Sequence, residues 1–448
     1  MADAASRLMW RNGTEKAVVS PLLLLYFPAQ PASGRDRFSE AKSPVAFRWG
    51  TSERTAGAPV ILASPERIEA VRSAAAAVSP DVLSLAARIA AVPSPTGSEA
   101  AKSHLVAELF AAEGIASARD TLDDVVASIP GRVPPGAGGK RLLIAAHIDT
   151  VFPVETPLTI HRGEDRLDGP GIGDNSIAVA AAVKLKSLLA QAGETPAVDV
   201  LLTGNVGEEG LGNLRGIREV MSAHPDVGAV VALEGHNLGR VTHVAVGSRR
   251  FRVTATGPGG HSWGDFGRPN AIHALAKLIG EFDAIPLPRT PKTTLNVGTI
   301  EGGVSVNTIA PSASCLVDAR STEESALHRL SERVMRLCTR ANRANGVAFD
   351  LETIGERPAG VVPVDSPIVQ IAARTLAVLG REASFDASST DANVPIAAGV
   401  PAICIGLTTG GNVHRTDEFI DLAPVPDGLA QLALVTLALT EFLAADAL

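Results

Sequence analysis

Cysteine is scarce in this sequence. Its 448 residues include three cysteines, at the widely separated positions Cys315, Cys338 and Cys404. An odd number at such spacing excludes a disulfide framework and a paired CxxC zinc site. Few cysteines without a pairing pattern are typical of a reducing compartment, so we expect a cytoplasmic protein.

Excess positive charge and long apolar runs are also lacking. The formal net charge is −8, which excludes a broad nucleic-acid-binding surface because phosphate binding requires clustered Lys and Arg. No uninterrupted apolar run approaches the roughly 18 residues that span a bilayer. The nearest run, residues 17–27, resembles a signal-peptide core but contains Pro21 and follows a long polar lead, so we expect a cytoplasmic location over export. Neither nucleic acid nor a membrane is an expected partner.

Aromatic residues make up only 4% of the chain, yet hydrophobic residues reach 46% and charged residues 20%, which is globular composition. The length predicts two or three domains at roughly 100–200 residues each. Residues 1–65 differ from the rest, since they hold two of the three Trp and the only Tyr without sustained periodicity. We interpret them as an N-terminal extension, either disordered or a pro-segment.

Helical and strand patterns alternate after this extension. Residues 79–94 and 97–114 have the periodicity of amphipathic helices, and residues 142–149, 197–206 and 227–235 are short apolar strands. Continuous apolar strands between helices predict an α/β fold with a mostly parallel sheet covered by helices on both faces. We assign residues 66–245 and 358–448 to the two parts of this larger domain.

The pattern changes between residues 246 and 357. Strand and helix signals follow the order β-α-β-β-α-β, beginning with the half-polar strand "SRRFRVTATG". This is the order of the ferredoxin-like split βαβ motif. We therefore expect a small domain inserted into the larger one.

Ionisable residues follow the predicted buried strands. His147 and Asp149 are two positions apart, so they point to the same side where their strand leaves the core. Ligands of parallel α/β sheets bind at the carboxyl ends of strands. The other candidates at strand ends or in the loops beyond them are Asp174, Glu208, Glu209, Glu234 and His414. Two histidines and several carboxylates at one edge require a cation, and this ligand chemistry suits Zn²⁺ or, alternatively, Mn²⁺ or Co²⁺.

These segments resemble a known family. The motifs "HID" (147–149), "GDN" (173–175), "EEG" (208–210) and "LEG" (233–235), together with His414, are similar to those of the co-catalytic zinc metallopeptidases and amidohydrolases. That family includes glutamate carboxypeptidase, peptidase T, aminoacylase and succinyl-diaminopimelate desuccinylase. The resemblance extends from about residue 66 to the end of the sequence and implies the zinc-peptidase fold.

The resemblance implies two zinc ions. By this likeness, His147 and Glu234 hold one ion, Glu209 and His414 hold the other, and Asp174 bridges both. The expected activity is hydrolysis of an amide bond in a small peptide or N-acyl amino acid.

Further roles follow from the same likeness. Asp149 would orient His147, Glu208 would be the general base that takes a proton from water, and the peptide bond Asp174-Asn175 would be cis. Glu at position 234 resembles the aminoacylases and desuccinylases, whereas the short interval that precedes it resembles the carboxypeptidases. The choice between peptidase and deacylase therefore stays open.

The inserted segment resembles the lid and dimerisation domain of the family. This likeness implies a homodimer in which His261 of "GPGGHS" reaches the partner's active site and stabilises the oxyanion. It also assigns substrate binding to Asn307 and Arg320, and an arginine suits a terminal carboxylate through a bidentate pair.

Two alternatives remain. "GGHSWG" contains a G-x-S-x-G pattern around Ser262, and Asp391 and His414 follow in the chain order of a serine hydrolase. A nucleophile elbow needs a buried strand directly before the serine and a helix directly after it, and neither pattern is present. A non-catalytic binding protein on the same fold would be expected to lack a ligand or the base, and none is missing.

Overall fold

The structure is a computed structural model that describes residues 63–133, 139–344 and 346–446. The N-terminal extension predicted for residues 1–65 lies outside the described residues, except for positions 63–65.

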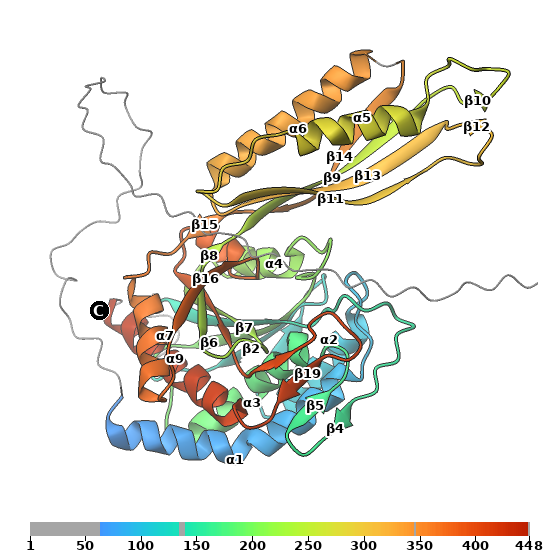
Figure 1. Ribbon diagram of the computed structural model, residues 1–448. Helices are drawn as coiled ribbons and strands as arrows, with labels where there is room; N and C mark the ends of the chain where they lie inside the picture. Colours follow the sequence, from blue (N-terminus) through green and yellow to red (C-terminus); the bar gives the residue numbers. More distant parts are fainter. Residues whose placement is uncertain (1–62, 134–138, 345, 447–448) are drawn as a thin grey trace, which may run out of the picture. The chain divides into compact units, whose positions relative to one another are not determined.

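Among the described residues, nine strands form one large sheet (Figure 1). The order is β1-β2-β6-β3-β7-β17-β8-β15, and β16 also pairs with β8. The central strands β6, β3, β7 and β17 are parallel, whereas β1, β2 and β15 pair antiparallel. The sheet is therefore mixed. The expected parallel pairing is found in its centre and between β8 and β16. The strands are β1 (Ser117–Arg119), β2 (Val125–Ile129), β3 (Arg141–His147), β6 (Val200–Asn205), β7 (Val227–Glu234), β8 (Arg240–Ala245), β15 (Gly360–Val361), β16 (Ser384–Ser388) and β17 (Ala402–Gly406).

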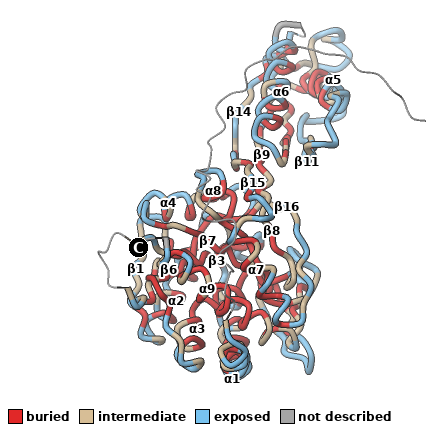
Figure 2. The backbone as a smooth tube through the Cα atoms, turned by 90° about the vertical axis from the view of Figure 1, so that its left-hand side faces the viewer, coloured by how far each residue is buried: buried red, intermediate tan, exposed pale blue. Residues whose placement is uncertain are grey.

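Apolar residues bury the central strands on both faces. Every residue of β6 and β17 is buried, as is β3 from Leu142 to His147 (Figure 2). A strand that is covered on both faces has a continuous apolar sequence, so these central strands could be predicted from the sequence. The helices around this sheet are α1 (Pro65–Ala90), α2 (Ala100–Ala112), α3 (Ile177–Gln191), α4 (Arg215–Ala223), α7 (Pro367–Val378), α8 (Asn393–Ala397) and α9 (Val425–Asp446).

Helix α1 begins earlier than the pattern predicted. A start near residue 79 was expected, but Ser64 caps the helix by accepting a 3.3 Å hydrogen bond from the Arg67 amide. The helix then continues through Pro80. Its buried side is unbroken from Val71 to Val82 and packs against α3 and α9. This packing outweighs the hydrogen bond that a proline removes from a helix interior.

Helix α9 corrects the expectation about membrane-spanning length. Among the described residues, its segment Val425–Ala445 is long and apolar enough to cross a membrane, although 72% of its apolar window is buried within the protein. It packs against α1, α7 and β3, as a core helix does. The sequence predicts a last helix from Asp427, but Gln431, Thr436 and Thr440 interrupt its apolar runs, so no uninterrupted run reaches the spanning length.

A second sheet of four strands lies between β8 and β15 in the chain. Its order is β11-β13-β9-β14 with every pair antiparallel, which is the ferredoxin-like arrangement. Helices α5 and α6 pack side by side on this sheet (Figure 1), over a separate core that includes Phe251, Val253 and Val317. We call residues 247–357 the inserted segment. It comprises β9 (Gly247–Thr256), α5 (Ala271–Asp283), β11 (Thr293–Gly302), β13 (Ser312–Ser321), α6 (Glu324–Ala344) and β14 (Ala348–Arg357).

Two short features complete the fold. Strands β10 (Gly260–His261) and β12 (Thr308–Ile309) form a two-stranded ribbon within the inserted segment. A small antiparallel sheet, not anticipated from the sequence, has the order β18-β19-β5-β4 and comprises β4 (His161–Arg162), β5 (Arg166–Asp168), β18 (Gly410–Gly411) and β19 (Phe419–Asp421).

Candidate metal centre

The parallel strands of the large sheet end at one edge, where most of the predicted residues meet. His147 ends β3 and Glu234 ends β7. Glu208 and Glu209 follow β6, and His414 lies beyond β17, after the short strand β18. All five lie on an open cleft with a volume of about 480 Å³. The carboxyl ends of parallel strands, with the loops beyond them, thus bring these side chains together.

The cleft combines an acidic cluster with basic side chains. Its acidic residues are Asp174, Glu208, Glu209 and Glu234. Four arginines also line it, one from the large sheet and three from the inserted segment, namely Arg240, Arg250, Arg320 and Arg357. A cleft of this composition suits metal ions at one end and an anionic group of a ligand at the other.

Asp174 links the two histidines. Nε2 of His147 lies 3.0 Å from Oδ1 of Asp174 and 3.8 Å from Oε2 of Glu234. Nε2 of His414 lies 3.1 Å from Oδ2 of Asp174 and 2.9 Å from Oε1 of Glu209. Each carboxylate oxygen of Asp174 therefore faces a different histidine, and two separate groups of ligand atoms share this one residue.

These groups fit metal ions. In each, one ligand atom from every residue lies within 4.8 Å of the others. Oδ1 of Asp174 is buried and has no hydrogen-bond partner among the described residues, although His147 Nε2 is 3.0 Å away. Two atoms that approach closely without hydrogen-bond geometry are arranged as ligands of a common cation would be.

The pKa values reflect uncompensated negative charge. Burial opposes protonation of His147, but its contacts with Asp149, Asp174 and Glu234 outweigh this and raise its pKa well above the ordinary value. Hydrogen bonds with Asp174 and Glu209 raise the pKa of His414 to about 10. Protons on the histidines thus supply the positive charge that bound metal ions would supply.

Two acids of the cleft are affected differently. Burial raises the pKa of Glu234 to about 7, although its contact with His147 opposes the shift. Burial also acts to raise the pKa of Asp174, but its contacts with His147 and His414 lower it well below the usual range. The carboxylate between the two histidines is thus the more strongly held anion.

Asp149 fixes the loop that carries both glutamates. Its Oδ1 and Oδ2 accept hydrogen bonds from the amides of Glu208 and Glu209, at 3.0 and 2.9 Å. Thr96 Oγ1 donates to the same carboxylate at 2.8 Å. The ring of His147 is 3.6 Å from the Asp149 carboxylate and 3.1 Å from its carbonyl oxygen. Asp149 therefore connects β3 to the loop after β6, a function that the sequence did not indicate.

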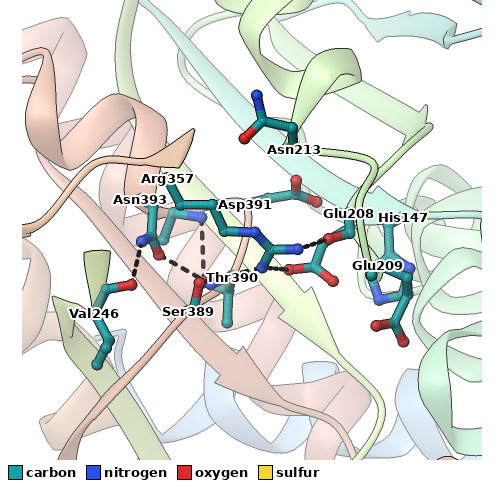
Figure 3. A network of polar contacts seen from close by, with 12 residues as sticks. His147, Glu208, Glu209, Asn213, Val246, Arg357, Ser389, Thr390, Asp391 and Asn393 are labelled. Atoms are coloured by element: carbon teal, nitrogen blue, oxygen red, sulfur yellow. Dashed lines mark hydrogen bonds and ion pairs between the residues drawn. The ribbon is translucent and has the colours of Figure 1, made fainter. Parts of the chain in front are cut away.

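Glu208 is buried beside an arginine (Figure 3). Nη1 of Arg357 donates a 3.1 Å hydrogen bond to Oε1 of Glu208, and Nη2 donates to its carbonyl oxygen. Burial raises the pKa of Glu208 well above its ordinary value, although the charges of Arg357 and His147 oppose this. A carboxylate with a raised pKa at the edge of a cleft has the character of a general base.

Two further residues near Asp174, Glu418 and His236, were not predicted from the sequence. The buried carboxylate of Glu418 accepts hydrogen bonds from the amides of Gly171 at 2.7 Å and Asp174 at 2.8 Å. Nε2 of His236 lies 2.7 Å from Oε1 of Glu418. The only signal was the position of these residues beside His414 and Glu234 in the sequence. The peptide bond Asp174-Asn175 is cis, as the resemblance implied.

The predicted substrate-binding residues separate into two places. Arg320 lines the cleft, where Asp318 accepts a 2.6 Å hydrogen bond from its Nε. His261 and Asn307 do not line it, and they lie together on the β10–β12 ribbon, where the Ser262 amide donates to the Asn307 carbonyl at 3.0 Å. The structure thus brings Arg320, but neither His261 nor Asn307, to the metal cluster of the described chain.

The serine-hydrolase alternative is not supported by this placement. Ser262 follows the two-residue strand β10, and the next helix begins only at Ala271. Asp391 accepts a 2.6 Å hydrogen bond from Asn205, and His414 contacts Asp174 and Glu209. Within the described residues, no hydrogen bond or ion pair joins Ser262, Asp391 and His414 to one another.

A sheet edge with clustered imidazoles and carboxylates has the ligand chemistry of a transition-metal site. The chain belongs to Peptidase family M20/M25/M40, whose model matches residues 143–438, about two thirds of the sequence. It is a member of a family of metal peptidases and amidohydrolases, as the motifs indicated.

Curated relatives carry more than one activity in their names. Succinyl-diaminopimelate desuccinylase of Corynebacterium glutamicum is 26% identical over 304 residues, covering 65% of this chain and 80% of that protein. A protein of Blastomyces gilchristii named "Probable carboxypeptidase" is 30% identical over 208 residues, covering 42% of this chain and 47% of that one.

Solved structures share the fold. A Staphylococcus aureus tripeptidase matches with a TM-score of 0.69 at 19% identity, covering 81% of this chain and 98% of that chain. A Bacillus subtilis protein described as a dinuclear metal binding peptidase matches with a TM-score of 0.61 at 16% identity, covering 82% and 99%.

Proposed function

We propose that this protein is a two-metal hydrolase that cleaves an amide bond in a small substrate bearing a carboxylate. The observation that carries the proposal is Asp174, whose two carboxylate oxygens lie 3.0 and 3.1 Å from Nε2 of His147 and His414. His147, Asp174 and Glu234 would hold one ion, and Asp174, Glu209 and His414 the other. Zn²⁺ suits this set, with Mn²⁺ or Co²⁺ as alternatives.

Two divalent ions in these places would supply Lewis acidity to the water and the scissile carbonyl. Glu208 takes the proton from the attacking water and later gives it to the leaving amine. Asp149 keeps this base in place through its hydrogen bonds to the amides of Glu208 and Glu209. Arg320 binds the substrate carboxylate from the inserted segment through its guanidinium group.

We further propose a homodimer formed through the inserted segment, with His261 and Asn307 acting in the partner's cleft. Nδ1 of His261 accepts hydrogen bonds from the amides of Trp263 and Gly264, both at 3.2 Å. Nε2 must then carry the ring hydrogen, so it is available to donate to an oxyanion. The absence of both residues from the cleft lining supports action from a second subunit.

The substrate belongs to the small peptides or N-acyl amino acids. The names of the relatives include a desuccinylase and carboxypeptidases, so both acyl and peptidyl substrates belong in the assay. Three buried cysteines without disulfides are consistent with a cytoplasmic location.

Metal analysis tests the proposal directly. Purified protein should contain close to two transition-metal ions per chain, and exhaustive chelation should abolish hydrolysis of N-acyl amino acids or dipeptides. Asp174→Asn should lose bound metal, whereas Asp168→Asn should not, because Asp168 pairs with Arg166 outside the cleft lining. Activity that survives chelation but is blocked by a serine-directed phosphonate would reassign the reaction to Ser262.

A matched substrate pair tests the carboxylate. A dipeptide with a free carboxylate should be cleaved in preference to its C-terminal amide, and Arg320→Met should remove this preference. Equal cleavage of both by the unmodified enzyme would contradict carboxylate recognition.

A further inference from the structure

Arg357 has a role that the proposed function leaves unexplained. It is the last residue of β14 and is only 5% exposed. Its guanidinium donates to the side-chain Oε1 of Glu208 and to the carbonyl oxygen of the same residue (Figure 3). One side chain therefore holds both the carboxylate and the backbone of the proposed base.

This contact is more than packing. Removing a guanidinium from water is costly, and well-packed apolar side chains often replace buried ion pairs without loss of stability. The remaining contact of Arg357 is a 3.1 Å hydrogen bond to Ser389 Oγ, and its buried Nε has no partner among the described residues. A purely structural arginine would be expected to have all its donors satisfied. The donors of Arg357 are instead directed to Glu208.

Arg357 also lies where the chain passes between the two sheets. The chain enters the inserted segment after Val246 and leaves it at Pro358. Nδ2 of Asn393 donates to the carbonyl oxygens of both crossings, each at 2.9 Å. Oδ1 of Asn393 accepts from the Thr390 amide at 2.9 Å, directly beside the Ser389 that Arg357 contacts. Hydrogen bonds, together with the chain link between Ser389 and Thr390, thus connect the crossing at Val246 to Glu208 (Figure 3).

A second connection joins the same two regions. The Glu356 amide donates a 2.6 Å hydrogen bond to Oδ1 of Asn213, in the loop that follows Glu208. Nη2 of Arg218 donates to the Glu356 carbonyl at 2.8 Å. Glu356, near the end of β14, is therefore bonded through its amide to the loop that follows Glu208 and through its carbonyl oxygen to helix α4.

We propose that Arg357 is a positioning residue that fixes the carboxylate of Glu208 and links its orientation to the two chain crossings. The inference rests on the proposed function, in which Glu208 is the general base. Without the guanidinium, the Glu208 side chain loses its hydrogen-bonded anchor within the described chain. A displacement of about 1 Å at a reacting group can lower the rate by about 10²-fold.

The first test compares Arg357→Ala with Arg252→Ala. Arg252 is the matched control because it belongs to the same segment but forms an exposed pair with Glu352. We expect Arg357→Ala to lower kcat by about 10²-fold, with KM nearly unchanged and metal content intact, and Arg357→Lys to recover part of the loss. Added guanidinium, at a non-denaturing concentration, should restore kcat only in Arg357→Ala. A raised KM with unchanged kcat would overturn the inference, because it would identify a substrate-binding residue.

The second test is a double-mutant cycle with Glu208→Gln. If Arg357 acts through Glu208, the double variant should have the same residual kcat as Glu208→Gln alone. A fall in kcat equal to the product of the two single-variant factors would overturn the inference. Full activity of Glu208→Gln would refute the proposed function itself, whereas unmodified activity of Arg357→Ala beside an inactive Glu208→Gln would refute only the positioning role. Should Arg357→Ala fail to fold, Arg357→Lys enters the same cycle with the same criteria.

Discussion

The edge of the large sheet and the β10–β12 ribbon carry different parts of the expected catalytic apparatus, and they are built differently. At the sheet edge, His147, Asp149 and Glu208 are buried and contact one another or nearby polar groups. On the ribbon, His261 is exposed, and the neighbouring Trp263 and Phe266 are 87% and 89% exposed. These residues at the sheet edge have their contacts within one chain. Those at the ribbon are exposed to solvent.

This difference separates two ways of placing a functional group. Residues at the ends of parallel strands are fixed by the register of a buried sheet, so a single chain positions them. Exposed aromatic residues on a short ribbon are typical of a surface that meets another molecule. We therefore expect substitutions at the sheet edge to act within a subunit and those on the ribbon to act between subunits.

The largest effect is expected from the sheet edge. Glu208→Gln keeps the size of the side chain but cannot accept a proton, so kcat should fall by about 10²–10⁴-fold. Steady-state kinetics and elemental analysis of the same preparation measure this. Metal content should remain unchanged, and its parallel loss would identify Glu208 as a ligand instead.

The ribbon should give the next largest effect. His261→Ala removes one donor to the oxyanion, so we expect kcat to fall by about 10²–10³-fold without loss of metal. Mixing it with Glu208→Gln should recover about a quarter of the activity, since half of randomly exchanged dimers carry one intact site. No recovery despite demonstrated subunit exchange would place His261 in its own subunit's reaction or outside the reaction.

A smaller effect is expected beneath the metal cluster. Glu418→Gln weakens the acceptor for the amides of Gly171 and Asp174, and residues that support metal ligands typically change affinity by about 10–100-fold. Calorimetric titration of the metal-free protein measures this directly. Asp417→Asn is the adjacent control because Asp417 pairs with Arg415 at the surface, and equal affinities in both variants would refute the supporting role.

The smallest effect is expected on the exposed face of the inserted segment. The Arg252–Glu352 ion pair has a separation of 2.8 Å, with about half of each side chain exposed. Arg252→Met should change the free energy of unfolding by about 0.5 kcal/mol or less, as measured by denaturant titration. A larger loss of unfolding free energy would show that this face is more buried in solution than it is in the single chain.

Apolar pattern and motif order predicted much of the architecture. The strands that became β3, β6, β7 and β17 were recognisable because burial on both faces requires continuous apolar runs. Their order in the chain then predicted that His147, Glu234 and His414 would meet at one edge. The start of α1 and the antiparallel edges of the sheet were not predicted, because distant packing partners decide them.

The supporting residues of the site could not be found in the same way. Glu418 and Asp174 are 244 positions apart, and Arg357 and Glu208 are 149 apart. A lone glutamate or arginine in a sequence has no periodicity, and most such residues are solvated. Only the folded chain shows that these two are buried beside the site.

The sequence by itself determined the residue types and order of the metal-binding set, because most of its imidazoles and carboxylates stand at the ends of buried strands or in the loops beyond them. It also determined the β-α-β-β-α-β order of the inserted segment through its alternating and helical periodicities. Tertiary structure alone decided that Asp174 faces both histidines, that Asp149 holds the glutamate loop, and that His261 and Asn307 lie outside the cleft lining. The physical reason is that periodicity records whether a residue faces the core, whereas the direction of a polar side chain depends on partners brought near only by folding.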